Sequence, residues 1–206
     1  MVQTIEQKII SRIYGHGRGW AFSQADFTDL GTRTTIDSCL HRLEKQTTVR
    51  RVIRGVYDYP RFSELLQQTV APDIDQVALA LARKFAWRIQ PDGATAQNLL
   101  GLSTQVPARV VYLSDGPNRS YAVGKTKLAF EHAALKEAVF KLPESRLIVQ
   151  ALKAYGEGRT TPKLIAQIRQ KFDSALRRKI LRDTKTATGW VYAAIQEIAK
   201  EETARG

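Results

Sequence analysis

The feature that most constrains the fold of this chain is an alternation of cationic and aliphatic side chains over residues 48–60. Good strand formers occupy most of this stretch, and they are interspersed with three arginines: Arg50, Arg51 and Arg54. Valine, isoleucine and tyrosine favour extended backbone, and the dipeptide Arg54-Gly55 suits a tight reversal between two strands. The stretch therefore predicts a short basic β-hairpin.

Three helical patterns precede the hairpin. Residues 4–14 repeat isoleucine with the period of an amphipathic helix, at Ile5, Ile9, Ile10 and Ile13. Ser23, with Asp26 three residues later, has the pattern of a helix N-cap, and Gly31 suits a C-cap, so we expect a second helix over about 23–30. Thr32 then caps a third helix over about 33–45.

The third helix has one apolar face and one polar face. Its inward residues are Ile36, Leu40 and Leu43, and Cys39 lies beside them as a small core residue. The predicted order of elements is helix, helix, turn, helix and basic hairpin. This order is the layout of a winged helix-turn-helix, which is a DNA-binding module. We therefore expect residues 1–60 to form a winged helix-turn-helix domain.

The polar helix face and the hairpin supply the candidate DNA contacts. Short hydroxyls beside cationic groups suit the major groove, where arginine binds guanine in a bidentate manner, and hairpin arginines can reach phosphates. The expected DNA-binding residues are Arg33, Thr34, Thr35, Ser38, His41, Arg42, Lys45, Arg50, Arg51 and Arg54. Two structural alternatives stay open: a solvated helix face, and arginines that protect an exposed edge strand from aggregation.

The rest of the chain, residues 61–206, predicts a second, α+β domain with a helical tail over about 131–206. Helices are expected over 61–68 as a linker, over 74–86 after the cap Asp73, and over 94–100. Strands are expected over 87–90, 108–113, 119–123 and 127–130. In the tail, helices are expected over 147–155, from Pro162 onward, over 173–183 and over 188–202.

The charge of the chain is its strongest compositional signal. The net charge is +12 and the pI is about 10.0, values that are typical of nucleic-acid binding because cations neutralise phosphates. A net charge that serves only solubility, or a basic surface that binds an acidic protein, would give the same excess of basic over acidic residues. The tail is the most basic part, and its cluster is expected to contact phosphate or a partner: Arg177, Arg178, Lys179, Arg182 and Lys185.

The sequence lacks the signatures of an enzyme or a metal site. The three histidines do not have metal-ligand spacing, and no HExxH, GxSxG or P-loop motif occurs. Cys39 is the single cysteine, which excludes an intramolecular disulfide and a thiolate zinc cluster. No apolar run approaches the roughly 18 residues of a membrane span, and no secretory signal is present. We therefore expect a cytoplasmic protein without catalytic residues, metal or cofactor.

Two segments together resemble a known family. The end of the hairpin, residues 54–60, is similar to the end of the N-terminal domain of AbiEi-type antitoxins, and residues 94–107 are similar to the family's entry into its second domain. The likeness covers about residues 1–130. These antitoxins belong to type IV toxin–antitoxin systems of abortive phage infection. The resemblance implies that the chain represses its own operon at inverted repeats in the promoter and counteracts a nucleotidyltransferase toxin, and it does not require a stable complex with that toxin.

Other functions are compatible with the same sequence. The winged fold can serve as a scaffold for protein interactions, and the charged tail favours this alternative. The chain can also be a plain transcriptional regulator without a toxin partner. The charge alone is compatible with binding of structured RNA.

Overall fold

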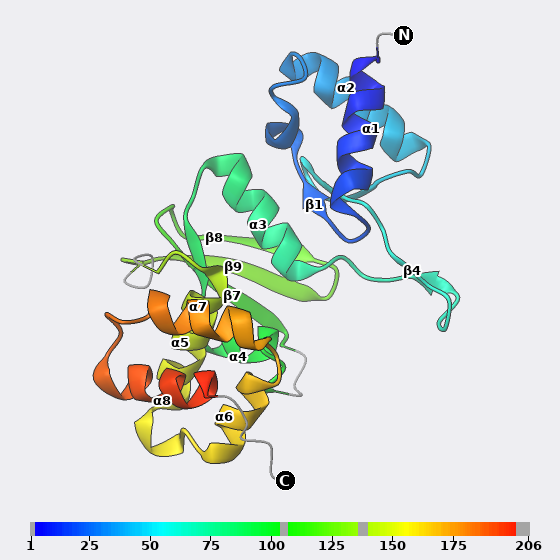
Figure 1. Cartoon of the computed structure of the whole chain (residues 1–206). Helices are drawn as coiled ribbons and strands as arrows, with labels where there is room; N and C mark the ends of the chain where they lie inside the picture. The colour runs from blue at the N-terminus through cyan, green and yellow to red at the C-terminus, as the bar shows by residue number, and fades with distance from the viewer. Residues whose placement is uncertain (1–2, 104–106, 136–139, 201–206) are drawn as a thin grey trace. The chain divides into compact units, whose positions relative to one another are not determined.

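The computed structural model describes residues 3–103, 107–135 and 140–200, and it confirms the expected α+β class (Figure 1). The chain separates into two compact units, which we describe one at a time. The first unit comprises residues 1–89, 108–110 and 116–130, and the second comprises residues 90–107, 111–115 and 131–206.

The first unit begins with helix α1 (Ile5–His16), which has the capping box of Thr4 and Gln7 at its start. The short strand β1 (Ala21–Phe22) and the 3-10 turn η1 (Gln24–Phe27) follow. Helix α2 (Arg33–Lys45) has the predicted bounds, and the Thr32 hydroxyl accepts a hydrogen bond from the Thr35 N–H at its N-terminus. The helical patterns at 4–14 and 33–45 are thus confirmed.

The helix expected over 23–30 was wrong, because only one 3-10 turn forms there. The cap itself is present, since Ser23 and Asp26 make the reciprocal capping box. In a longer α-helix the carbonyl of Asp26 would accept from the N–H of Leu30. Here Arg12 donates to that carbonyl at 2.8 Å, and the Leu30 N–H turns to the carbonyl of Phe27 at 2.9 Å.

The basic hairpin is confirmed. Strands β2 (Arg50–Ile53) and β3 (Val56–Asp58) pair antiparallel, and β1 pairs with the other edge of β3, so the sheet order is β1-β3-β2. The reversal occupies Arg54 and Gly55, where Gly55 has a φ of +72° that favours glycine. Behind the sheet, α1 and α2 enclose an apolar core that includes Ile9, Ile13, Phe22, Phe27, Ile36, Cys39, Leu40, Leu43 and Val49.

Residues 61–69, which we call the arm, form a second hairpin and not the expected linker helix. Strands β4 (Phe62–Ser63) and β5 (Gln68–Thr69) pair with each other, and the Val70 N–H closes the base of the arm on the Arg61 carbonyl. The turn explains the difference. Ser63 Oγ accepts from the Leu66 N–H, and Gln67 adopts a left-handed φ of +48°, which a helix cannot accommodate.

Helix α3 (Ile74–Phe85) follows the arm, capped by Asp73 as expected. It packs against β1, η1 and β3. The four-stranded sheet that comes next in the chain has the order β6-β7-β9-β8 and consists of β6 (Ile89–Pro91), β7 (Arg109–Ser114), β8 (Arg119–Val123) and β9 (Thr126–His132). The four expected strands are therefore present within a few residues of their predicted bounds.

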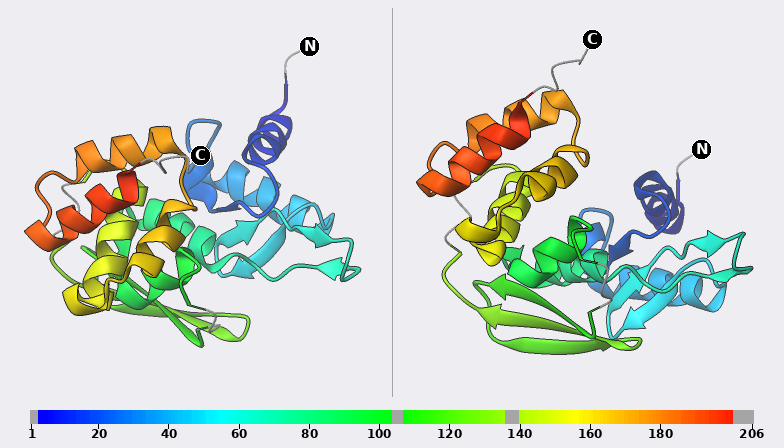
Figure 2. Two further views of the ribbon diagram at one scale, coloured as in Figure 1. Left: turned by 60° about the horizontal axis from the view of Figure 1, so that its bottom comes forward. Right: turned by 90° about the horizontal axis from the view of Figure 1, so that it is seen from below.

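The second unit is mainly helical (Figure 2). Its elements are α4 (Gly93–Leu99), α5 (Pro143–Tyr155), η3 (Glu157–Arg159), α6 (Pro162–Arg169), α7 (Ser174–Asp183) and α8 (Gly189–Ala199). They share one apolar core, to which α5 contributes Ile148, Val149 and Leu152. Residues 131 and 132 belong to β9, which continues to His132, so the helical tail does not begin at residue 131; within the described residues its first α-helix is α5, which begins at Pro143. Residues 136–139 and the expected helix end at 201–202 lie outside the described residues.

Candidate nucleic-acid interface

The exposed face of α2 carries most of the predicted contact residues. Ile36, Cys39, Leu40 and Leu43 are buried, so the opposite face is turned to solvent. That face exposes Arg33, Thr34, Ser38, His41 and Lys45. Two of them are near acidic groups of the same helix, with Arg33 Nε 3.8 Å from Asp37 Oδ2 and His41 Nδ1 3.6 Å from Glu44 Oε2. At such distances these contacts are loose, and a stronger anion can replace them.

Thr35 and Arg42 lie on the side of α2 that faces α1. The Arg42 guanidinium donates to Glu6 Oε2 from Nε at 2.9 Å and from Nη2 at 2.7 Å, and Nη2 also lies 3.2 Å from Cys39 Sγ. This contact with Glu6 raises the pKa of Arg42 further. The Thr35 hydroxyl is 2.9 Å from that of Thr32. Arg42 therefore links α2 to α1, whereas the Thr35 hydroxyl contacts the N-cap of its own helix, and neither side chain shares the face of Ser38 and His41.

The two arginines of strand β2 also differ, because one is bound inside the unit and the other is exposed. Arg50 is half-buried, and its Nε donates to Asp58 Oδ1 at 3.0 Å while its Nη1 donates to the Val70 carbonyl at 3.0 Å. Since Asp58 is buried, Arg50 neutralises a carboxylate inside the unit. Arg51, the next residue, is exposed and opposes Tyr57 across the strands. Burial raises the pKa of the Tyr57 phenol, and the charge of Arg51 partly offsets this effect.

Lys84 of α3 is a residue of this surface that sequence reasoning missed. Its Nζ donates to the carbonyls of Gly55 at 3.2 Å and Arg54 at 3.4 Å, at the tip of the β2–β3 hairpin. Burial lowers the pKa of Lys84, the positive charges of Arg33 and Arg54 lower it further, and the Asp37 carboxylate partly offsets them. Lys84 of α3 therefore lies at the hairpin tip, and the charged groups of α2 that act on it are Arg33 and Asp37. Nothing in the sequence near residue 84 indicates this neighbourhood.

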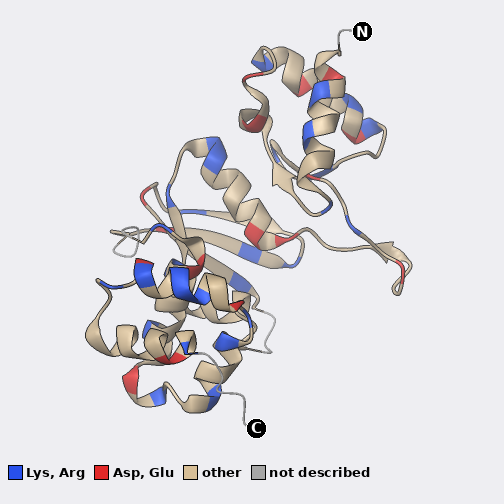
Figure 3. Cartoon of the chain, in the orientation of Figure 1, with Lys and Arg blue, Asp and Glu red and all other residues tan. Residues whose placement is uncertain are grey.

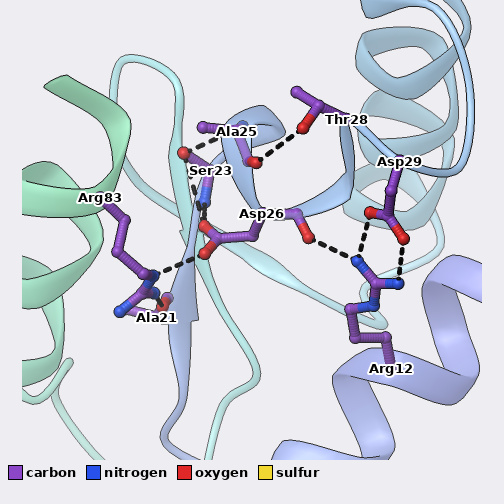
Figure 4. Close-up of polar contacts among 8 residues, drawn as sticks. All are labelled: Arg12, Ala21, Ser23, Ala25, Asp26, Thr28, Asp29 and Arg83. Carbon is purple, nitrogen blue, oxygen red and sulfur yellow. Dashed lines mark hydrogen bonds and ion pairs between the residues drawn. The ribbon is translucent and has the colours of Figure 1, made fainter. Parts of the chain in front are cut away.

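A second contact joins α3 to the N-terminal segments (Figure 4). Arg83 donates from Nε to Asp26 Oδ1, and from Nη2 to the Ala21 carbonyl at 2.8 Å. The other oxygen of Asp26 accepts from the Ser23 N–H at 2.8 Å. On the far side of η1, Arg12 binds both carboxylate oxygens of Asp29 at 2.7 Å. These contacts hold η1 between α1 and α3, and thereby fix the segment that leads into α2.

The basic cluster of the tail lies on α7 and just after it (Figure 3). Arg178, Lys179, Arg182 and Lys185 are exposed. Arg177 differs, because its Nη1 donates to the carbonyls of Ile198 at 3.3 Å and Lys200 at 3.4 Å, at the C-terminal end of α8. A cation at that end of a helix is favoured by the helix dipole. Arg177 therefore ties α7 to α8, whereas the other four residues form a surface.

No other kind of site emerges from the described residues. Within residues 3–103, 107–135 and 140–200, no group of three or more His, Cys, Asp or Glu side chains could hold a metal ion. Over the same residues, no helix has the length and apolar character needed to cross a membrane.

The comparison with protein families gives a match over most of the chain. The model of DUF6088, described as a family of unknown function, matches residues 8–180. The chain belongs to the DUF6088 family. A comparison with curated proteins found no match.

The matched range of this DUF6088 protein includes most of the surface described above. It contains all of α2, the β2–β3 hairpin and α3, and it ends within α7, so that Arg182 and Lys185 lie beyond it. The description of the family names no activity. A function is therefore inferred from the chemistry of the surface formed by α2, the β2–β3 hairpin and α3.

Proposed function

We propose that this DUF6088 protein binds double-stranded DNA through an N-terminal winged helix-turn-helix, with α2 as the recognition helix and the β2–β3 hairpin as the wing. The observations that carry the proposal are the exposed polar face of α2, which begins at Arg33, and the hairpin tip at Arg54, to which Lys84 of α3 is hydrogen-bonded. Cations of separate elements that lie close together repel one another, and a phosphate backbone relieves that repulsion.

The proposal gives different tasks to the predicted contact residues. Arg33, at the first turn of α2, would read a guanine edge, and the face of Thr34, Ser38, His41 and Lys45 would line the major groove. Arg51 and Arg54 would contact phosphates from the wing. Thr35, Arg42 and Arg50 would act indirectly, because their side chains are engaged inside the unit.

We further infer that the protein is an antitoxin of the AbiEi type, which would repress its own promoter and counteract a nucleotidyltransferase toxin in the cytoplasm without being an enzyme. Two segments support this inference by their resemblance: the hairpin end at 54–60, and residues 94–107, of which 104–106 lie outside the described residues. The basic surface of α7 would then contact phosphate or an acidic partner.

A mobility-shift titration on the DNA upstream of the chain's own gene tests DNA binding. We expect salt-sensitive binding below micromolar concentration. Arg33→Ala should weaken binding to the specific site by about 1–3 kcal/mol, whereas Arg51→Ala should weaken all sequences alike and reduce the salt slope by about 1. Lys163→Ala, which removes an exposed charge of α6, is the matched control. No salt-sensitive binding below micromolar would refute the proposal, and stronger competition by duplex RNA would favour an RNA ligand.

The antitoxin role needs a separate experiment. The chain would be co-expressed with a nucleotidyltransferase encoded beside it, and growth would be followed. Rescue of growth is expected from the wild-type chain and also from Arg33→Ala if operator reading and antitoxin action are separate tasks. A chain that represses its promoter but gives no rescue would be a plain transcriptional regulator.

A further inference from the structure

The C-terminal end of α3 and the first residue of β8 form a cluster of two aromatic rings and one arginine. The rings of Phe85 and Trp87 are stacked, with their centroids 4.7 Å apart. Ala86, which has a left-handed φ of +55°, ends α3 between them. The guanidinium carbon of Arg119 lies 5.0 Å from the centroid of Phe85 and 5.5 Å from that of Trp87. All four residues belong to the first unit, and the two rings therefore share one cation.

The packing around Trp87 holds this cluster in place. A side-chain carbon at Gly116 would overlap the indole ring, so Trp87 lies directly on the backbone there. The ring also meets the buried Phe130 edge-on, with the centroids 5.5 Å apart. Trp87 is half-buried, whereas Arg119 is exposed. The rings are therefore a fixed support that holds a guanidinium at the surface.

The guanidinium of Arg119 remains available to an anion. An arginine that packs on an aromatic ring uses the face of its guanidinium and keeps the N–H donors that lie in its plane. Among the described residues, no carboxylate is paired with Arg119. Residues 116–130 contain Arg119, Lys125 and Lys127 but no acidic residue. Such a planar group suits phosphate, to which it can donate two parallel hydrogen bonds.

The cluster lies beside the tip of the β2–β3 hairpin. Lys84 Nζ, which donates to the carbonyls of Arg54 and Gly55 at this tip, is 5.5 Å from the centroid of the same Phe85 ring. Strand β8, which begins at Arg119, lies against β2. Arg119 is therefore a neighbour of the hairpin tip, although it follows the hairpin by a long stretch of sequence.

We propose that Arg119, held against Phe85 and Trp87, binds a phosphate of duplex DNA next to the phosphates that the hairpin contacts. This inference rests on the proposed function and extends the DNA-binding surface beyond the winged helix-turn-helix to β8. Duplex DNA is the ligand because a phosphate backbone that reaches the exposed Arg54 also passes the cluster. The stacked side chain is already ordered, so it loses less conformational entropy on binding than a free arginine does.

Mobility-shift titrations of the full chain on its own upstream DNA, at a series of salt concentrations, test the role of Arg119. Arg119→Gln should weaken binding about tenfold and reduce the salt slope by about 1. Arg119→Lys keeps the charge but not the planar fork, so it should restore the salt slope and only part of the affinity. Arg18→Gln is the matched control, because Arg18 is also an exposed arginine that stacks on a ring, 4.6 Å from the centroid of Tyr59. It lies at the other end of β3 and should bind like the wild-type chain.

Ethylation of single phosphates of the same DNA gives a readout that a merely structural role would not move. We expect at least one phosphate whose ethylation weakens binding of the wild-type chain but not of Arg119→Gln. A wild-type chain that binds, together with an Arg119→Gln chain of unchanged salt slope and ethylation pattern, would overturn this inference alone. A lower urea midpoint of Arg119→Gln with the same unchanged slope and pattern would mean that Arg119 only stabilises the fold, which also overturns it. A wild-type chain without salt-sensitive binding to duplex DNA would overturn the proposed function as well.

Discussion

Arg83 and Asp26, which are 57 residues apart, form an ion pair that joins α3 to the 3-10 turn η1. Asp26 also completes the capping box of η1, because its other oxygen accepts from the N–H of Ser23, the N-cap residue. The Asp26 side chain is only 8% exposed, so its charge depends on Arg83 for compensation. Helix α3 is therefore a structural part of the unit that presents α2, although it begins after residue 60.

Replacement of Arg83 should destabilise the first unit. In Arg83→Ala the Asp26 carboxylate loses its cationic partner while it stays largely buried, and we expect a loss of about 1–3 kcal/mol in the free energy of unfolding. Urea denaturation measures this change. Arg33→Ala removes an exposed arginine whose nearest carboxylate is 3.8 Å away, and it should change stability by less than about 0.5 kcal/mol. Equal effects of the two substitutions would contradict the role given to Arg83.

Arg50 and Arg51 are neighbours in β2 with opposite expected effects. Arg50→Ala leaves the buried Asp58 without its guanidinium, so we expect a stability loss of about 3 kcal/mol. Arg51→Ala removes an exposed side chain and should leave the urea midpoint unchanged, while duplex DNA binding weakens. The two readouts, unfolding and mobility shift, are compared for both variants. A destabilised Arg51→Ala protein would count against the surface role of Arg51.

The sequence predicted those elements that are determined by local signals. Thr32 and Asp73 cap α2 and α3 as expected, and Gly55 occupies the reversal of the hairpin, because each acts on its own backbone neighbours. The arm and η1 could not be predicted, since they depend on a left-handed Gln67 and on Arg12, whose donation to the Asp26 carbonyl crosses 14 residues.

The sequence also predicted only part of the candidate DNA-binding surface. Helical periodicity placed Ser38, His41 and Lys45 on the exposed face of α2. Periodicity contains no information about partners from other elements, so the engagement of Arg42 by Glu6 and the approach of Lys84 to the hairpin tip were not foreseeable. Long-range contacts decide which cations of a basic segment stay available to a ligand.

Lys84 should position the wing as well as add charge. Lys84→Met keeps most of the side-chain volume but removes the two hydrogen bonds to the hairpin carbonyls. We expect duplex binding to weaken by about 1–2 kcal/mol and the salt slope to fall by about 1. Lys8→Met, an exposed lysine of α1, is the charge-matched control and should have a smaller effect in the same titration. An identical loss in both variants would mean that only net charge matters.

Asp183 should make the stability of the second unit dependent on pH. Its carboxylate oxygens accept hydrogen bonds from the backbone N–H groups of Lys141 at 3.0 Å and Leu142 at 2.9 Å, and so anchor the segment that enters α5. Partial burial opposes ionisation, but the N–H groups of Leu142 and Lys141, together with Ser145 and the charge of Lys141, outweigh it and lower the pKa of Asp183. A carboxylate whose pKa is lower in the folded than in the unfolded state stabilises the fold above its unfolded pKa of about 3.9.

That stabilisation should disappear as the pH falls through the folded pKa of Asp183. Asp183→Asn should therefore lower the melting temperature at about pH 7, and the difference from the wild-type protein should shrink below about pH 3. Thermal unfolding followed by circular dichroism at a series of pH values measures the difference. Glu157→Gln, a change at an exposed carboxylate of η3, is the control and should show little difference at any pH. If the effect of Asp183→Asn stayed constant from neutral to acidic pH, the carboxylate would act only through its shape.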